Sequence, residues 1–188
     1  MRPLTAILAA TAAIAAGSCS RSADTPIPRR TAYPRIEAYA DSTATAHIGP
    51  LAFDIAAQAD TAMPRPGWLD IAYPRYRATI HIAVRHLGSG EELADAIDNR
   101  VQRMSLNLGD RTAVASDFEN SAGFSCHTVT SLDGGPTPVQ FMAYSADGYL
   151  LSGAAAISGA AGPADSIAPT VQALARDAET ILKSLRRE

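Results

Sequence analysis

The 188-residue chain has a net charge of −3, and this balance excludes the strongly basic surface of a typical nucleic-acid-binding protein. Hydrophobic residues make up 47% of it, which is enough to bury a sizeable core in one domain. The chain has two cysteines, and acylation of Cys19 would leave Cys126 without a disulfide partner, so we expect side-chain packing to hold the fold together.

The N-terminal residues have the pattern of an exported lipoprotein. An apolar run, residues 4–16, is about as long as a secretory h-region and shorter than the roughly 20 residues that span a bilayer. Small residues and then Cys19 follow it, and the bacterial lipoprotein pathway acylates a cysteine at such a position. We therefore expect residues 1–18 to be a lipoprotein signal peptide, and Cys19 to be anchored by more than one acyl chain, such as palmitate. An ordinary secretory signal, with Cys19 incidental, is the alternative.

The following residues predict a stem and then a domain. Residues 19–32 are rich in Ser, Pro and Arg, so they form no core and indicate an extended tether. We expect residues 33–188 to be a single domain, held at a membrane of the cell envelope and facing the periplasm. The sequence leaves open whether that membrane is the inner or the outer one.

Alternating apolar residues predict strands in the first half of the domain. Residues 33–39 and 51–55 each indicate a strand, and the Pro and Gly content of residues 62–67 indicates a loop. Residues 68–73 predict a short strand that ends before a proline. Residues 78–84 show the clearest alternation, with one apolar face and one basic and polar face.

A change of periodicity predicts a helix of about five turns after these strands. The sequence of residues 89–92 fits a capping box at its start, and Gly109 is a natural C-terminal stop. Its apolar stripe comprises Leu93, Ile97, Val101, Met104 and Leu108.

Four further strands and a second helix complete the pattern. The strands are expected at residues 112–118, 123–130, 139–144 and 149–157, separated by short turns that suit an antiparallel meander. The last helix begins near residue 165 and has an apolar stripe of Ile167, Val171, Leu174, Ala178, Ile181 and Leu185. Strands in runs, rather than in strict alternation with helices, predict an α+β fold with an antiparallel sheet. The order of elements resembles the PsbP/Mog1-like sandwich.

Several short stretches, in order along nearly all of the expected mature chain, carry a family resemblance. They are Pro26-Ile27-Pro28-Arg29 with Tyr33-Pro34-Arg35-Ile36, residues 68–76 (WLDIAYPRY), Ala78-Thr79-Ile80, Pro138-Val139-Gln140-Phe141, Leu151-Ser152-Gly153-Ala154 and Asp165-Ser166-Ile167-Ala168-Pro169. Together they resemble the gliding-motility lipoprotein D (GldD-like) family of Bacteroidota. The resemblance implies an exported lipoprotein needed for gliding and for the type IX secretion machinery. It implies no established enzymatic activity and no catalytic residues.

Residues with reactive side chains show no spacing typical of a catalytic or metal site. Cys126 and His127 are adjacent, so a strand would point them to opposite faces, and His81 lies on another predicted strand. We expect Cys126 to be buried and to pack as a small hydrophobic residue, and His127 to face the solvent. We expect that the protein is not an enzyme and that it binds no cofactor and no metal. A small exported ligand-binding or hydrolytic domain that uses Cys126 with these histidines is the alternative.

Arginine and aromatic residues alternate around two proline-containing stretches. The residues concerned are Arg65, Trp68, Tyr73, Arg75 and Tyr76. Such side chains dominate the energetics of many protein interfaces, so we predict a binding surface here, although Trp68 in the core is an equally good interpretation. The partners that we expect are other secretion or motility lipoproteins or membrane proteins. Peptidoglycan is a further class of partner that this surface would suit, and nucleic acid is not expected.

Overall fold

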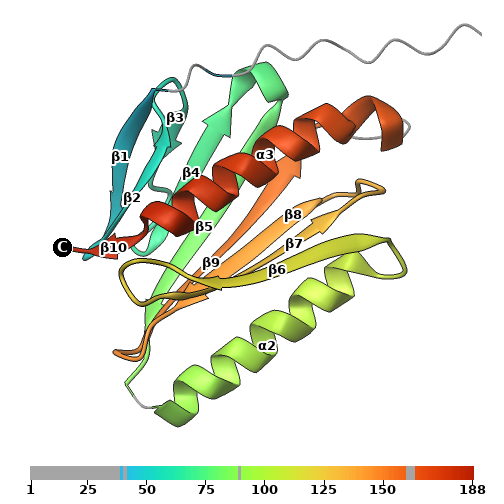
Figure 1. Cartoon of the computed structure of the whole chain (residues 1–188). Helices are drawn as coiled ribbons and strands as arrows, with labels where there is room; N and C mark the ends of the chain where they lie inside the picture. The colour runs from blue at the N-terminus through green and yellow to red at the C-terminus, as the bar shows by residue number, and fades with distance from the viewer. Residues whose placement is uncertain (1–38, 40–41, 89, 160–163) are drawn as a thin grey trace, which may run out of the picture. The chain divides into compact units, whose positions relative to one another are not determined.

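An antiparallel sheet forms the centre of the fold, seen in a computed structural model that describes residues 39, 42–88, 90–159 and 164–188 (Figure 1). Within these residues the sheet has seven strands in the order β3-β4-β5-β9-β8-β7-β6, and each strand is antiparallel to its neighbours. The strands are β3 (Asp60–Ala62), β4 (Trp68–Tyr73), β5 (Ala78–His86), β6 (Ala113–Glu119), β7 (Ser125–Ser131), β8 (Val139–Tyr144) and β9 (Tyr149–Ile157).

A small sheet and the last helix lie on one face of the large sheet. The small sheet has the strand order β1-β2-β10, formed by Thr43–Ile48, Leu51–Ala56 and Arg186–Arg187. Helix α3 (Ala164–Ser184) packs against β2 of the small sheet and against β7 and β8 of the large one. A short 3-10 helix, η1 (Pro74–Tyr76), joins β4 to β5.

The alternation within β5 shows why the two faces of the large sheet differ. Ile80 and Ile82 are completely buried on the α3 face, whereas His81 between them is exposed on the other face. The same apolar and polar faces continue in β4, because Ile80 pairs with Ile71 and His81 pairs with Asp70. A period of two residues therefore separates an apolar layer from a polar one across the sheet.

Helix α3 buries the apolar stripe that the sequence predicts. Its buried residues on this side include Val171, Leu174, Ala178, Ile181 and Leu182, and Leu185 is buried directly after the helix. They meet the core residues that β2, β4, β5 and β8 present on the same face. This α3 face therefore holds most of the hydrophobic core.

Gly153 in β9 fits this core because it has no side chain. A Cβ atom at this position would overlap the ring of Phe141, its partner in β8. The carbonyl oxygen of Gly153 accepts a hydrogen bond of 2.7 Å from Arg100 Nη2 of the other helix. Glycine in the middle of a strand commonly marks such a close approach by another group.

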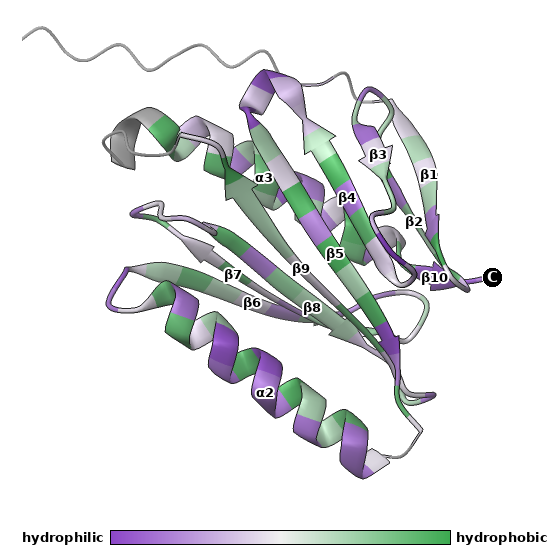
Figure 2. Cartoon of the chain, turned by 180° about the vertical axis from the view of Figure 1, so that it is seen from behind, coloured by the Kyte–Doolittle hydropathy of each residue, from purple (hydrophilic) through white to green (hydrophobic). Residues whose placement is uncertain are grey.

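Helix α2 (Gly90–Leu108) lies on the opposite face and contacts β9 (Figures 1 and 2). Its bounds agree with the prediction, but only Ala96 and Met104 are buried, and Val101 of the predicted stripe is 43% exposed. Polar groups hold the helix in place: Gln140 Nε2 donates to Met104 O, and Asn107 Nδ2 donates to Gln140 Oε1.

The α+β class, the antiparallel sheet and the C-terminal helix are confirmed, while the likeness to a PsbP/Mog1-like sandwich stays a prediction. Strands β1, β3 and β10 were not predicted from the sequence. The predicted strand at 33–39 lies outside the described residues except for Tyr39, which is in no strand. The predicted signal peptide, Cys19 and stem also lie outside them. Within the described part of the chain, neither helix is long and apolar enough to cross a membrane.

Candidate functional site

Two of the predicted binding residues, Arg65 and Trp68, meet at the start of β4. Gly67 between them has a φ of +74°, and its carbonyl oxygen accepts a hydrogen bond of 2.8 Å from Val84 N. This turn leaves Trp68 36% exposed on the face that carries α2. The Arg65 guanidinium carbon lies 3.7 Å from the centroid of the Trp68 ring, which is a close cation–π contact. The pair is therefore available at the surface.

The other three predicted residues lie at the opposite end of β4. Tyr73 is completely buried and Tyr76 nearly so, with ring centroids 5.8 Å apart. Tyr39 packs edge-on against both rings, and its N–H donates to the Tyr76 hydroxyl at 3.1 Å. Arg75 is exposed, with its guanidinium carbon 5.3 Å from the Tyr39 ring centroid.

The five residues therefore do not form one surface. Tyr73 lies five residues beyond Trp68, about 17 Å along the strand, and an odd spacing places the two side chains on opposite faces. Tyr73 and Tyr76 are part of the core cluster, in which Tyr73 is completely buried and Tyr76 is 6% exposed. A role in binding for Arg65, Trp68 and Arg75 stays a prediction.

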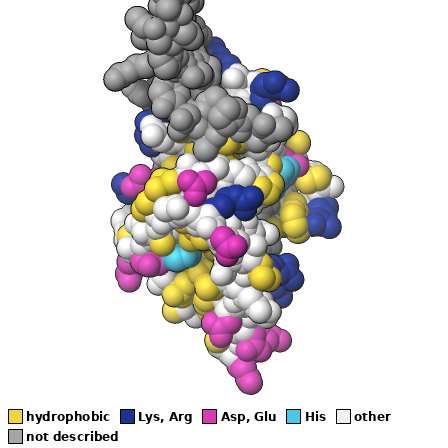
Figure 3. Space-filling view, turned by 90° about the vertical axis from the view of Figure 1, so that its right-hand side faces the viewer, with side chains coloured by type: hydrophobic (Ala, Val, Ile, Leu, Met, Phe, Trp, Pro, Cys, Tyr) yellow, Lys and Arg dark blue, Asp and Glu magenta, His cyan; other side chains and the backbone are white. Residues whose placement is uncertain are grey.

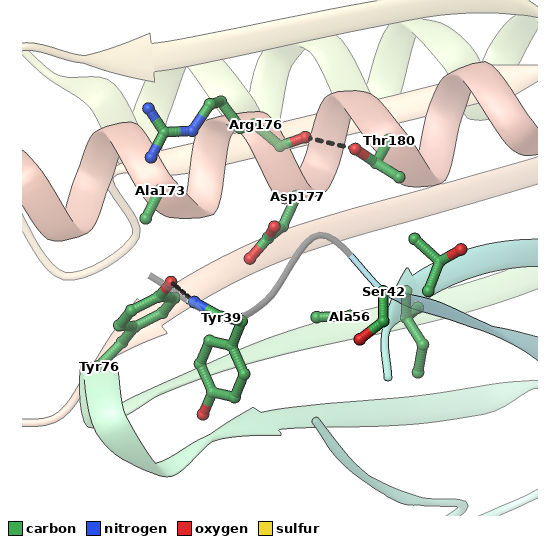
Figure 4. A pocket seen from close by; sticks show the side chains of 10 residues that line it. Tyr39, Ser42, Ala56, Tyr76, Ala173, Arg176, Asp177 and Thr180 are labelled. Carbon is green, nitrogen blue, oxygen red and sulfur yellow. Dashed lines mark hydrogen bonds between the residues drawn. The ribbon is translucent and has the colours of Figure 1, made fainter. Parts of the chain in front are cut away.

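A cleft of about 360 Å³ lies between Tyr39, Tyr76, α3 and the small sheet. Asp177 of α3 points into it (Figure 4). The Asp177 Oδ2 atom is buried without a hydrogen-bond partner among the described residues, and so is the Tyr73 hydroxyl. Burial raises the pKa of Asp177 to about 6. Burial and the nearby Asp177 carboxylate together raise the pKa of Tyr73 far above its usual value. Below its pKa, Asp177 becomes a hydrogen-bond donor inside this cleft.

Asp177 is a residue that the sequence-based search for a site missed. The signal was present, because Asp177 comes directly before Ala178 and three residues after Leu174, within the apolar stripe of α3. A carboxylate in an apolar stripe indicates either a functional group or a destabilised core position.

The reactive residues of the alternative hydrolytic site are brought together only in part, because Cys126 and His127 line one cleft beside α2 and His81 does not. Cys126 is buried on the α3 face, and burial raises the pKa of its thiol to about 11. His127 lies on the opposite face, with its Nδ1 atom 2.5 Å from Asp117 Oδ1. His81 is on β5, three strands away or about 14 Å, and its Nδ1 lies 2.7 Å from Asp70 Oδ1. The described residues contain no group of three or more potential ligands placed to hold a metal.

A second cleft, of about 560 Å³, opens between α2 and strands β6 to β8. Its apolar lining comprises Ile97, Val101, Phe118, Met142 and Tyr144, and Asp117 and Glu119 lie beside them. On the side of the domain shown in Figure 3, hydrophobic side chains reach the surface in patches between charged ones. The α2 side of the sheet is therefore both open and partly apolar.

Comparison with known proteins identifies the family, although no curated protein matches the chain in sequence. The family model described as "Gliding motility lipoprotein GldD" matches residues 23–186, which is nearly the whole chain and includes every described strand and both described helices except for the end of β10. The match agrees with the resemblance seen in the short sequence motifs. The chain therefore belongs to the gliding motility lipoprotein GldD family.

Proposed function

We propose that this protein is a non-enzymatic accessory component of the gliding-motility and type IX secretion machinery, which faces the periplasm and works by binding its neighbours. Family membership makes it a gliding motility lipoprotein, a class of protein anchored in the cell envelope. His81 lies three strands away from Cys126 and His127, and the Cys126 thiol is buried in the core, and both observations support a role without catalysis.

The cleft between α2 and strands β6 to β8 is the observation that carries this proposal. Val101 belongs to the apolar stripe of α2, yet it remains 43% exposed at the edge of the cleft. Burying such a side chain in an interface contributes on the order of 1–2 kcal/mol. The carboxylates of Asp117 and Glu119 line the same cleft, so the partner that fits is an apolar segment flanked by Lys or Arg. Another lipoprotein or membrane protein of the same machinery would supply it.

Replacing Val101 by Glu tests this surface directly. The added carboxylate faces an apolar cleft that already holds acidic residues, so we expect the partner to be lost while the domain stays folded. The measurements are colony spreading, secretion of type IX cargo and crosslinking to partners, in a gliding host that lacks its own copy of the protein.

Leu106→Glu is the matched control, because Leu106 is on the same helix, is 73% exposed and does not line the cleft. We expect Leu106→Glu to behave like the wild type. Protein abundance and circular dichroism establish that each variant is folded, and Val101→Ser provides a milder second change. Normal spreading and secretion with folded Val101→Glu would contradict the proposed surface.

A further inference from the structure

A third cleft, of about 370 Å³, contains a cluster of arginines on the α2 side of the sheet. Arg85 comes from β5, and Arg100 and Arg103 come from α2, three residues apart and therefore on one side of the helix. Trp68, Ala83 and Leu150 provide an apolar wall from β4, β5 and β9.

The described residues provide no ion-pair partner for the positive charges of this cleft. Among the described residues, Arg85, Arg100 and Arg103 form no ion pair. Arg100 Nη2 donates to Gly153 O, but its Nε atom is buried without an acceptor. Burial, and then the charge of Arg103, lower the pKa of Arg100. Holding unpaired charges together costs free energy, and an anion in the cleft would recover it.

We propose that this cleft binds the phosphate group of a small organic phosphate. Guanidinium groups match phosphate oxygens in bidentate geometry, and three of them line one small space. A phosphate monoester carries nearly two negative charges and three acceptor oxygens, whereas a carboxylate carries one charge and two oxygens. The phosphate therefore compensates more of this positive charge.

The remaining surface of the cleft indicates what the phosphate is attached to. Its volume is at the small end of the range for ligand pockets, so a compact body such as glycerol or one sugar ring fits. Trp68 offers that body an aromatic surface, and Arg65 stacks on Trp68, which adds a fourth guanidinium close to the cleft. The shared chemistry is a phosphate monoester, either on the headgroup of a lipid of the phosphatidic-acid type or on a free phosphorylated sugar.

Titration calorimetry on the full-length chain in detergent tests the proposal. The probes are inorganic phosphate, glycerol phosphate and a hexose phosphate, with chloride at matched ionic strength as the control. We expect all three phosphates to bind and chloride to give no signal. Tighter binding of glycerol phosphate assigns the site to a lipid headgroup, and tighter binding of the hexose phosphate assigns it to a sugar.

The double variant Arg85→Gln/Arg103→Gln tests whether phosphate binds in this cleft. Both side chains are exposed, so the fold tolerates their replacement, and we expect phosphate affinity to fall roughly tenfold or more. Arg176→Gln on α3 removes the same charge from the other side of the sheet and should leave affinity unchanged. If the double variant melts early, Arg103→Gln alone replaces it. Absence of phosphate binding above the chloride control, or equal affinity in the wild type and the cleft variant, overturns the proposal.

Discussion

The two faces of the large sheet carry helices with similar apolar patterns, but they bury them to different extents. Leu174 and Ile181 of α3 are completely buried, whereas Val101 of α2 is 43% exposed. The difference lies in the sheet: β8 presents Phe141 to α3 and Gln140 to α2. A helix stripe therefore becomes core only where the opposing strands are apolar too, and the α2 side retains open clefts.

The largest change in stability is expected when one leucine of each helix is replaced by alanine. We expect Leu174→Ala to lower the free energy of unfolding by about 2–5 kcal/mol, because it leaves a cavity in the closed core. Leu93→Ala on α2 removes the same atoms from a half-buried position and should cost about 1 kcal/mol. Urea unfolding of both variants measures the two costs. Equal costs would show that the two faces are packed equally well.

A methyl group added at the centre of the sheet has the next largest effect. Gly153→Ala brings a Cβ atom into the ring of Phe141, and overpacking of this kind costs about 1–3 kcal/mol. A second change, Phe141→Leu, removes the ring edge and should recover part of that loss in the double variant. Thermal melting of the two single variants and the double variant gives the coupling. Purely additive effects would contradict the close approach.

A smaller effect is expected from Asp177 on the α3 face, which should make the free energy of unfolding depend on pH. Its pKa is raised to about 6 in the folded protein, so the native state binds more protons than the unfolded chain between about pH 4 and pH 6. Stability should therefore fall as the pH rises through this range, and the loss is complete above it. Solvent screening keeps the loss on the order of 1–2 kcal/mol.

Asp177→Asn should remove this slope and make the protein more stable at neutral pH than the wild type. Glu179→Gln is the control, because Glu179 is exposed and pairs with Lys183 at the surface. Urea unfolding at about pH 4 and about pH 7 measures the free energy of unfolding of the wild type and of both variants. An unchanged slope in Asp177→Asn would mean that another group titrates with the fold.

The sequence predicted those elements whose own pattern decides their structure. The bounds of β4 and α2 followed from an alternating run and from a periodic stripe that ends before Gly109. By contrast, β3 is exposed throughout and β10 has two residues, so neither has an apolar pattern to detect. β3 forms because the neighbouring β4 pairs with it, and β10 forms because β2, from a distant part of the chain, pairs with it.

The positions of the candidate binding residues were harder to predict than the strands. Counting along β4 shows that Trp68 and Tyr73 point to opposite faces, so the sequence alone indicates that the two side chains do not share a surface. The arginine cleft was not accessible in the same way. Arg85 and Arg103 meet only because β9 returns to pair with β5 while α2 crosses the same face. Such neighbours follow from topology, which local patterns do not contain.

Gly153 has a consequence for how sequences of this family can diverge. Its missing side chain makes room for an aromatic ring on one face, and its carbonyl oxygen holds Arg100 on the other. Any substitution there disturbs both layers at once, whereas most surface positions can drift one at a time. We therefore expect natural variants to retain glycine at this position even where the arginines around it have been exchanged.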